Sequence, residues 1–372
     1  MNFGIICEFN PFHEGHAYLF EQARLLGAKN IVCAMSGNSV QRGELAIFDK
    51  YLRSEMAING GANLVLELPF PWCSASAEYF ATAGIRILAP ICDAIVFGSE
   101  CGDIDLLTRA ARASLEPSFA ERFEARKKCG EGAASAYFSL LEDSAGIMLS
   151  SNDLLGVEYI KASIKEGFDL DFYTVRREGL AYRDDTLKEG ELPSATALRK
   201  GIKEGSLSFL GDRGELVDER LLERAYLMYF RLSDPKELSE FAENEGGIAE
   251  RIHSLALSSA DYSEFWNSLR TKRYTDAKLR RAILFSLTRV KRELLLQVPE
   301  YTYLLGADEN GREILSSLRK NECAVRCITK PADAPRDCGQ RLAEDKLSAI
   351  FTLASTVSSA SGELCRKKAV IK

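Results

Sequence analysis

The sequence predicts an α/β fold in which helices cover both faces of a parallel sheet. Short β-rich runs bounded by Gly, Pro or Asn occupy residues 3–7, 30–34, 63–68 and 94–98. Segments with helical spacing of their apolar residues separate these runs. Strand and helix alternate about every thirty residues, as in the βαβ units that build parallel sheets. We therefore expect a Rossmann-like domain over residues 1–204, followed by a mainly helical domain over residues 205–372.

Later segments follow the same two patterns. The strand-like run LDFYTVRR lies at residues 170–177, before LPSATALRKGI at 192–202. We expect Asn152 or Asp153 to cap one helix and Ser194 to cap the next. After about residue 205 amphipathic helix dominates, and YTYLLG and CAVRCIT suggest a small α/β element near residues 300–328.

Composition restricts the class of protein. The hydrophobic fraction of 46% is ordinary for a globular chain, and no apolar run approaches the roughly 18 residues of a membrane span. We expect a cytoplasmic protein with no membrane partner. Ten cysteines scattered from Cys7 to Cys365 are typical of buried small side chains, and Cys323 and Cys327 lack a second pair that would complete a zinc site. A net charge of −6 leaves nucleic-acid binding to a local patch.

Two of the three histidines lie in the first loop, within EFNPFHEGH. His13 and His16 follow a strand, and the helix that starts there presents free N–H groups and a partial positive charge. Pro11 stiffens this turn, and Gly15 permits close backbone approach. The pattern favours imidazoles that donate hydrogen bonds to phosphate oxygens as charge accumulates in a transition state. The alternative is a satisfied loop histidine beside a helix-start histidine, and a zinc site is less favoured because no third ligand lies nearby.

The second loop, SGNSVQRGELAIFDKYLR, is long and polar for a connection in a compact sheet, and such loops are often functional. We expect some of its polar residues to line a substrate pocket. Asp49, Lys50 and Arg53 suit a structural set of ion pairs at the next helix. The pocket candidates are Ser36, Asn38, Gln41 and Arg42.

A basic segment lies in the second half of the chain. Residues 270–292 carry nine cations against one acid, Asp276. In an acidic protein this excess favours contact with an RNA backbone, although a solvated helix face is the alternative. The expected RNA contacts, which include a stacking ring, are Lys272, Arg273, Tyr274, Arg280 and Arg281.

The ordered motifs resemble one family. FHEGH after a first strand resembles the H-x-G-H signature of nucleotidyltransferases. GIICEFNPFHEGH, MSGNSVQRGELAIFDKYLR, GANLVLELPFPWCSASAEYFA, FGSECGD, SNDLLGVEYIKA, SATALRK and TKRYTDAKLRR follow the bacterial tRNA(Met) cytidine acetate ligase family in order and spacing. The resemblance runs from residue 2 to at least residue 319.

The resemblance implies a reaction. Enzymes of this family use ATP to activate acetate as acetyl-adenylate, release pyrophosphate, and acetylate N4 of the wobble cytidine of elongator tRNA(Met). Acetate, ATP and this tRNA are therefore the expected ligands, with Mg²⁺ accompanying ATP, although no acidic cluster marks a metal site. No obligate protein partner is evident.

The resemblance also implies site residues. His13 and His16 would stabilise the transition state. SATALRK resembles the second superfamily signature, which would hold the leaving pyrophosphate, although a plain N-cap and a solvated helix charge are the alternatives for Ser194 and Arg199. The implied ATP contacts are Cys7, Glu8, Phe9, Asn10, Pro11, Phe12, Glu14, Gly15, Gly98, Gly102, Asn152, Arg176, Arg177, Ser194, Thr196 and Arg199.

This chain departs from the commonest family pattern at Glu14, Ser39 and Leu45, and Ser39 would weaken stacking on the target base. Two other functions use the same histidines. One is a small-molecule adenylyltransferase of cofactor synthesis, which would not need the basic segment. The other is a non-catalytic protein that binds ATP and RNA, which would not need intact histidines. The residue that accepts the N4 proton is not apparent from the sequence.

Overall fold

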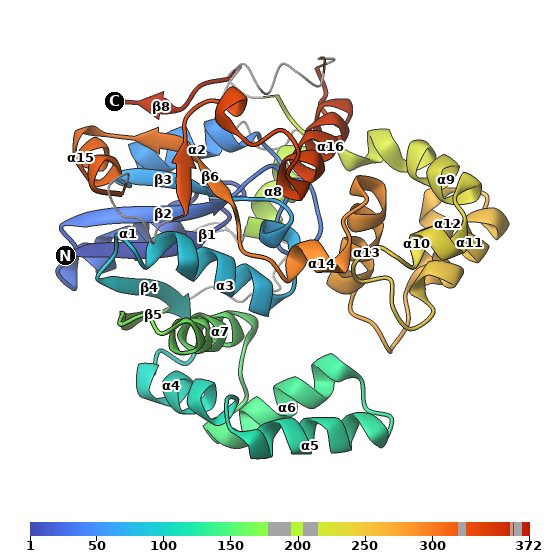
Figure 1. Cartoon of the computed structure of the whole chain (residues 1–372), viewed down its shortest axis with the longest axis horizontal. Coiled ribbons are helices and arrows are strands. Elements are labelled where there is room, and N and C mark those ends of the chain that lie inside the picture. The colour runs from blue at the N-terminus through green and yellow to red at the C-terminus, as the bar shows by residue number, and fades with distance from the viewer. Residues whose placement is uncertain (178–194, 204–214, 319–324, 358–359, 361–366) are drawn as a thin grey trace.

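A mixed eight-stranded sheet forms the centre of the computed structural model (Figure 1). The structure describes residues 1–177, 195–203, 215–318, 325–357, 360 and 367–372. Strand order is β5-β4-β1-β2-β3-β6-β7, and β8 pairs with β6. The strands are β1 (Asn2–Cys7), β2 (Asn30–Ser36), β3 (Leu64–Leu68), β4 (Ala94–Ser99), β5 (Asp171–Arg176), β6 (Tyr301–Ala307), β7 (Arg326–Ile328) and β8 (Val370–Ile371).

Helices pack on both faces of the sheet and extend beyond it. The α-helices are α1 (Glu14–Leu25), α2 (Lys50–Asn59), α3 (Ala77–Leu88), α4 (Ile104–Ala113), α5 (Pro117–Lys128), α6 (Ala133–Ala145), α7 (Ser151–Glu166), α8 (Ala195–Lys203), α9 (Glu223–Leu232), α10 (Pro235–Leu238), α11 (Ile248–Ser258), α12 (Tyr262–Leu269), α13 (Asp276–Thr288), α14 (Arg292–Leu295), α15 (Glu309–Leu318) and α16 (Gly339–Leu353). Short 3₁₀ helices occupy Trp72–Ser74, Glu219–Leu222 and Pro331–Asp333. None of the described helices combines the length and apolar character needed to cross a bilayer.

Alternating strand residues divide the interior into two cores. In β1, Ile6 packs in the core under α3 and α7, whereas Phe3 and Ile5 face the opposite core with α1 and α2. Successive side chains of a strand point to opposite faces, so this division follows from the period of two. The prediction of an α/β fold with a parallel sheet is confirmed for β1 to β5, all of which pair in parallel.

The C-terminal third returns to the sheet. Strand β6 is buried along its whole length and pairs antiparallel with β3, where Leu64 lies opposite Ala307. Without β6, β3 would be an exposed edge strand. The sheet therefore crosses the expected division at residue 204, and the element expected near residues 300–328 extends the main sheet. Residues 204–214 lie outside the described ranges.

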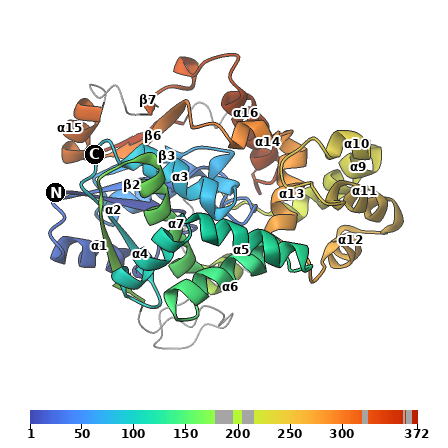
Figure 2. The ribbon, with the colours of Figure 1, turned by 60° about the horizontal axis from the view of Figure 1, so that its bottom comes forward.

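A helical bundle stands beside the sheet. Helices α9 to α12 lie together at the right of Figure 1, and α13 lies between them and the sheet. Phe230 and Phe265 are fully buried within the bundle, with ring centroids 6.1 Å apart. Helices α5 and α6 form a hairpin below the sheet, which comes forward in Figure 2. The bundle and the hairpin thus lie on different sides of the sheet (Figure 1).

Helix α7 begins two residues earlier than the nearer predicted cap, Asn152, would allow. Its N-cap is Ser150, whose side chain accepts a hydrogen bond from the N–H of Asp153. The Asp153 carboxylate accepts in return from the N–H of Ser150 at 2.8 Å. This reciprocal capping box leaves Asn152 in the first turn, so the prediction of Asn152 or Asp153 as the N-cap was wrong.

Candidate active site

The histidine loop joins the carboxyl end of β1 to α1. His13 is the N-cap of α1, and its Nδ1 accepts the N–H of Gly15 at 3.1 Å. The N–H of His13 in turn donates to Nδ1 of His16 at 3.2 Å. A ring nitrogen that accepts a hydrogen bond carries no proton, so each neutral imidazole holds its proton on Nε2. The loop therefore sets up two Nε2–H donors at a helix N-terminus, as an anion site requires.

Aromatic packing fixes the two rings. The imidazoles stack with centroids 3.8 Å apart. Phe9 is buried with a positive φ of 43°, and its ring contacts those of His16 at 4.8 Å and Phe12 at 5.1 Å. A positive φ is uncommon for a bulky residue and persists only where the surroundings hold it. Phe9 and Phe12 therefore act on the site through the orientation of His16.

Helix α8 brings a guanidinium group to the same loop. Arg199 Nη1 donates to the carbonyl of Asn10 at 3.0 Å. The side chain of Asn10 accepts from the N–H of Ile47 at 2.8 Å, which joins the histidine loop to the second loop. Thr196 belongs to α8, but its side chain and the whole of Ser194 lie outside what the structure describes.

Two arginines follow β5 and pack against glycines. A Cβ atom at Gly102 would lie 2.9 Å from Cβ of Arg176, and Gly102 has a φ of +63°. A Cβ atom at Gly98 would lie 3.3 Å from Cγ of Arg177. The absence of a side chain at both glycines therefore leaves room for the aliphatic stems of the arginines.

Glu100 organises the start of α7. Its carboxylate accepts from Asn152 Nδ2 at 2.7 Å and from the Ser150 hydroxyl, and it lies 4.0 Å from Arg177 Nε. Asp153 also accepts the N–H groups of Glu100 and Cys101, both at 3.1 Å. Sequence reasoning missed Glu100, although the motif FGSECGD contained it.

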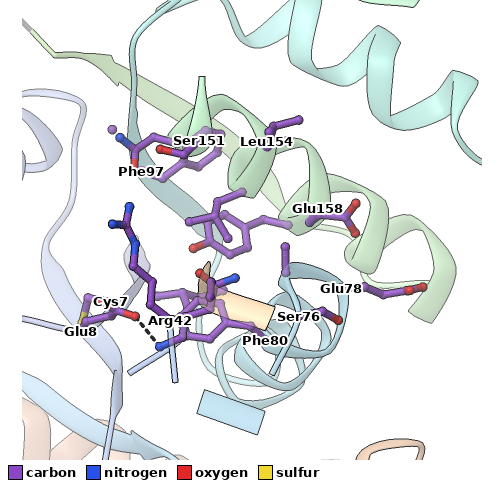
Figure 3. Close-up of a pocket in the computed structure, with 18 of the residues that line it drawn as sticks. Cys7, Glu8, Arg42, Ser76, Glu78, Phe80, Phe97, Ser151, Leu154 and Glu158 are labelled. Atoms are coloured by element: carbon purple, nitrogen blue, oxygen red, sulfur yellow. Dashed lines mark hydrogen bonds between the residues drawn. The ribbon is translucent and has the colours of Figure 1, made fainter. Parts of the chain in front are cut away.

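One cavity of about 1110 Å³ collects most of the predicted residues. It opens between the histidine loop, residues 41–42, helices α3, α5, α6 and α7, and the first turns of α13; Figure 3 shows part of its wall. Pro11, Phe12, Glu14 and Gly102 are absent from its described lining. The predicted residues that line it are Cys7, Glu8, Phe9, Asn10, Gly15, His13, His16, Gln41, Arg42, Gly98, Asn152, Arg176, Arg177, Arg199, Arg280 and Arg281.

The second loop divides into lining and supporting residues. Gln41 and Arg42 line the cavity, whereas Ser36 and Asn38 are buried outside its described lining. The side chain of Asn38 accepts from the N–H of Lys50 at 3.0 Å, so it shapes the loop. Ser39 is buried against Ser74, with 2.7 Å between the hydroxyl oxygens, so it does not stack on a base in the described cavity.

The basic segment contains more ion pairs than its sequence suggests. Arg281 is buried and pairs with Glu243 at 2.9 Å, and Arg280 pairs with Glu44. The Tyr274 hydroxyl donates to the carbonyl of Gly246, and the guanidinium of Arg273 lies 5.2 Å from the Tyr274 ring centroid. Fewer cations of this segment are free than the sequence predicts, because folding brings acidic side chains from distant segments next to them. The remaining pairs are Arg270 with Asp276, Lys278 with Glu243 and Glu245, Arg289 with Glu237, and Lys291 with Glu240.

Comparison with known proteins identifies the family. Residues 1–364 match the model of the HIGH Nucleotidyl Transferase family. A tRNA(Met) cytidine acetate ligase of Clostridium perfringens is 32% identical over 365 residues, which covers 90% of each chain. One of Thermotoga maritima is 33% identical over 374 residues, which covers 89% of each chain. The chain belongs to the tRNA(Met) cytidine acetate ligase family.

Solved structures of this ligase family agree with the architecture. The crystal structure of apo Thermotoga maritima TmcAL superposes with a TM-score of 0.87 at 28% identity and full coverage of both chains. The same protein bound with alpha-thio ATP superposes with a TM-score of 0.84. The predicted α/β nucleotidyltransferase fold is confirmed.

The electrostatics of the H-x-G-H loop keep both imidazoles neutral. Burial, with Arg177 and Arg199 adding repulsion, lowers the pKa of His13 to about 4. Burial and the neighbouring His13 lower the pKa of His16 well below its usual 6.5. The site of this ligase family member therefore combines two neutral imidazole donors with the positive charges of nearby arginines. An arriving triphosphate would supply the missing negative charge and raise both pKa values.

This arrangement predicts a loss of stability in acid. Below about pH 6.5 the unfolded chain protonates these histidines, whereas the folded chain resists protonation down to about pH 4. The unfolded state then binds more protons, so the free energy of unfolding falls as pH falls through this window. Between pH 7 and pH 5, the free energy of unfolding of the His13→Asn variant should fall by about 1 kcal/mol less than that of the wild type. This value allows for partial solvent screening of the histidine. Urea unfolding at both pH values measures the difference, and equal losses would contradict the prediction.

Proposed function

We propose that this protein is an ATP-dependent ligase that activates acetate as acetyl-adenylate and acetylates N4 of the wobble cytidine of elongator tRNA(Met). Its family membership and the names of its relatives support the reaction. The observation that supports the first step is that two Nε2–H donors and the guanidinium groups of Arg177 and Arg199 border one cavity. We expect the reaction to occur in the cytoplasm, where tRNA functions.

The first step is attack of an acetate oxygen on the α-phosphorus of ATP, with pyrophosphate as the leaving group. Negative charge builds on the non-bridging oxygens, where fixed donors stabilise the transition state more than the ground state. His13 and His16 supply those donors. Arg199, anchored on Asn10, suits the leaving pyrophosphate because a guanidinium remains charged and forks toward phosphate oxygens.

Mg²⁺ would accompany ATP. Within the described ranges, no group of three His, Cys, Asp or Glu side chains is placed to hold a metal ion. We therefore assign no side chain of the described ranges to the ion. Mg²⁺ commonly binds through substrate phosphates with few protein ligands, which is the form in which we expect it here.

The test is incorporation of labelled acetate into tRNA. Purified protein is incubated with ATP, Mg²⁺, radiolabelled acetate and bacterial tRNA, and the digested RNA is examined for labelled N4-acetylcytidine. ATP-dependent label in that nucleoside is the expected result. Transfer of AMP to a phosphorylated small molecule would instead identify an adenylyltransferase. Tight tRNA binding without either product would identify a binding protein.

We further propose that the exposed end of the basic segment contacts tRNA. Lys272 and Arg273 are exposed, and no acid of the described chain lies within ion-pairing distance of either side chain. Gly132, in the α5–α6 turn, approaches the carbonyl of Arg273, with 3.7 Å between that oxygen and a Cβ built at Gly132. These cations therefore lie beside the wall of the cavity, where a bound RNA would deliver a base.

Reversing both charges tests this surface. Lys272→Glu with Arg273→Glu should weaken tRNA binding at least tenfold, and should reduce the slope of log affinity against log salt by about 1.5. Arg289→Glu with Lys291→Glu is the matched control, because it makes the same charge change at cations already paired with acids. Filter binding at several salt concentrations measures both. Equal effects of the two double variants would argue against a localised tRNA contact.

A further inference from the structure

Acetyl transfer to cytidine requires a proton acceptor. When N4 attacks the acetyl carbonyl, the nitrogen gains a fourth bond and must release a proton before the amide is stable. The exocyclic amine is weakly nucleophilic because its lone pair is delocalised into the ring. A positioned base contributes about 10²–10⁴-fold to such steps. The inference below rests on the proposed function.

Four acidic side chains occur in the described lining of the cavity, and three of them are committed to cations. Glu78 pairs with Lys165 at 3.3 Å, Glu158 with Lys161 at 3.3 Å, and Asp276 with Arg270 at 3.0 Å. Among the described residues, no cation lies within ion-pairing distance of Glu8, the fourth. An unpaired carboxylate is free to take up and release a proton.

The position of Glu8 is fixed by the backbone around it. Glu8 directly follows β1, and its Oε1 accepts the N–H of Gln41 at 2.7 Å. The carbonyl of Glu8 accepts from Arg53 Nη1, so the main chain is also held. Its other carboxylate oxygen has no hydrogen-bond partner among the described residues. Figure 3 shows Glu8 beside Arg42 on the side of the cavity opposite α7.

Glu8 also lies where the two substrates would meet. It precedes His13 in the histidine loop, on the same strand end that presents the phosphate donors. Through Gln41 it contacts the second loop, which packs on α13: a Cβ at Gly43 would lie 2.6 Å from the backbone nitrogen of Arg281. The carboxylate is therefore placed between the nucleotide side of the cavity and the basic segment.

The charges around Glu8 suit a base. Burial raises its pKa, and the Gln41 N–H together with Arg199, Arg42 and Arg53 opposes that shift. The titratable side chains of Cys7 and Tyr159 also interact with Glu8, and burial raises the pKa of both, so both stay protonated. Half-buried carboxylates with raised pKa values are more effective general bases than fully solvated ones.

We propose that Glu8 is the general base that accepts the N4 proton during acetyl transfer. The N4 lone pair forms the new C–N bond, and the C–O bond to the α-phosphate breaks with its electrons leaving on AMP. The N4 proton moves to Glu8, which returns it to solvent. No oxidant, reductant or further reactant is needed.

Separate assays of the two half-reactions test this role. Acetate-dependent exchange of labelled pyrophosphate into ATP reports adenylation, and single-turnover acetylation of tRNA reports transfer. Glu8→Gln retains an oxygen that accepts the Gln41 N–H but cannot accept a proton. We expect transfer to fall at least about a hundredfold, and adenylation to fall far less. Glu78→Gln, the same change at a paired carboxylate of the same wall, should alter transfer less than threefold.

The pH dependence of acetyl transfer provides a second test. A role of Glu8 in merely supporting the loop would not change this dependence. Transfer by the wild type should slow as pH falls through the pKa of Glu8, since the base must be ionised, and Glu8→Gln should lack this acid limb. Transfer by Glu8→Gln at the wild-type rate would overturn the proposal, as would equal losses in both half-reactions. Failure of the wild type itself to exchange pyrophosphate or acetylate tRNA would refute the proposed function instead.

Discussion

Replacing His16 with alanine should lower the rate of acetyl-adenylate formation at least about a hundredfold, because fixed donors at developing charge contribute about 2.7–4 kcal/mol each. The loss should appear mainly in kcat, since the Nε2–H donor acts most strongly on the transition state. Acetate-dependent pyrophosphate exchange measures this step without tRNA. His13→Ala should behave similarly, because its Nδ1 is also occupied by a backbone N–H.

Amide substitutions of His16 distinguish the role of the Nε2–H donor from that of the imidazole ring. Glutamine places an amide N–H near the position of Nε2, whereas asparagine places its polar atoms near Nδ1. His16→Gln should therefore retain more activity than His16→Asn, and the reverse order would contradict an Nε2 donor. His253 on α11 is the matched control, because its Nδ1 lies 2.9 Å from the carbonyl of Phe230, away from the cavity. His253→Ala should change the exchange rate less than threefold.

Replacing Arg53 with alanine should destabilise the protein by about 3–5 kcal/mol, since it removes a charged partner from buried polar groups. Arg53 is fully buried and donates to the carbonyls of Phe48 at 3.0 Å, of Glu8 and of Gly37. Its loss would leave three carbonyls without a donor in the loops that carry Glu8 and Gln41. The free energy of unfolding in urea measures the effect.

Two variants, Arg53→Lys and Arg122→Ala, serve as controls. Arg53→Lys keeps the charge but lacks the planar fork, so it should recover only part of the stability. Arg122→Ala removes an arginine that pairs with Asp143 but is 54% exposed, and it should cost less than about 1 kcal/mol. A similar cost for Arg53→Ala would show that water replaces the guanidinium at these carbonyls.

The contrast between β1 and β6 shows how far the sequence predicts the fold. The runs that became β1 to β4 were predictable because each is apolar, bounded by turn residues and separated from the next by helical spacing. The run that became β6 was also recognisable as a strand. Its partner β3 lies more than two hundred residues earlier in the chain, and no local pattern specifies such an antiparallel pairing.

The candidate site shows the same division. His13, His16 and Arg199 were predictable, because their chemistry depends on short motifs at strand ends and helix starts. Glu100 was missed because its role depends on Ser150, Asn152 and Arg177, which reach it from α7 and from the end of β5.

The sequence by itself determined the alternation of strand and helix, the histidine loop and the resemblance to a ligase family, because local spacing and residue type carry that information. Only the tertiary structure decided which charges are paired. It paired Arg281 with Glu243 and Arg280 with Glu44, and among the described residues it placed no cation within ion-pairing distance of Glu8. Electrostatic energy depends on distance through space, and the distances between residues far apart in the chain exist only after folding.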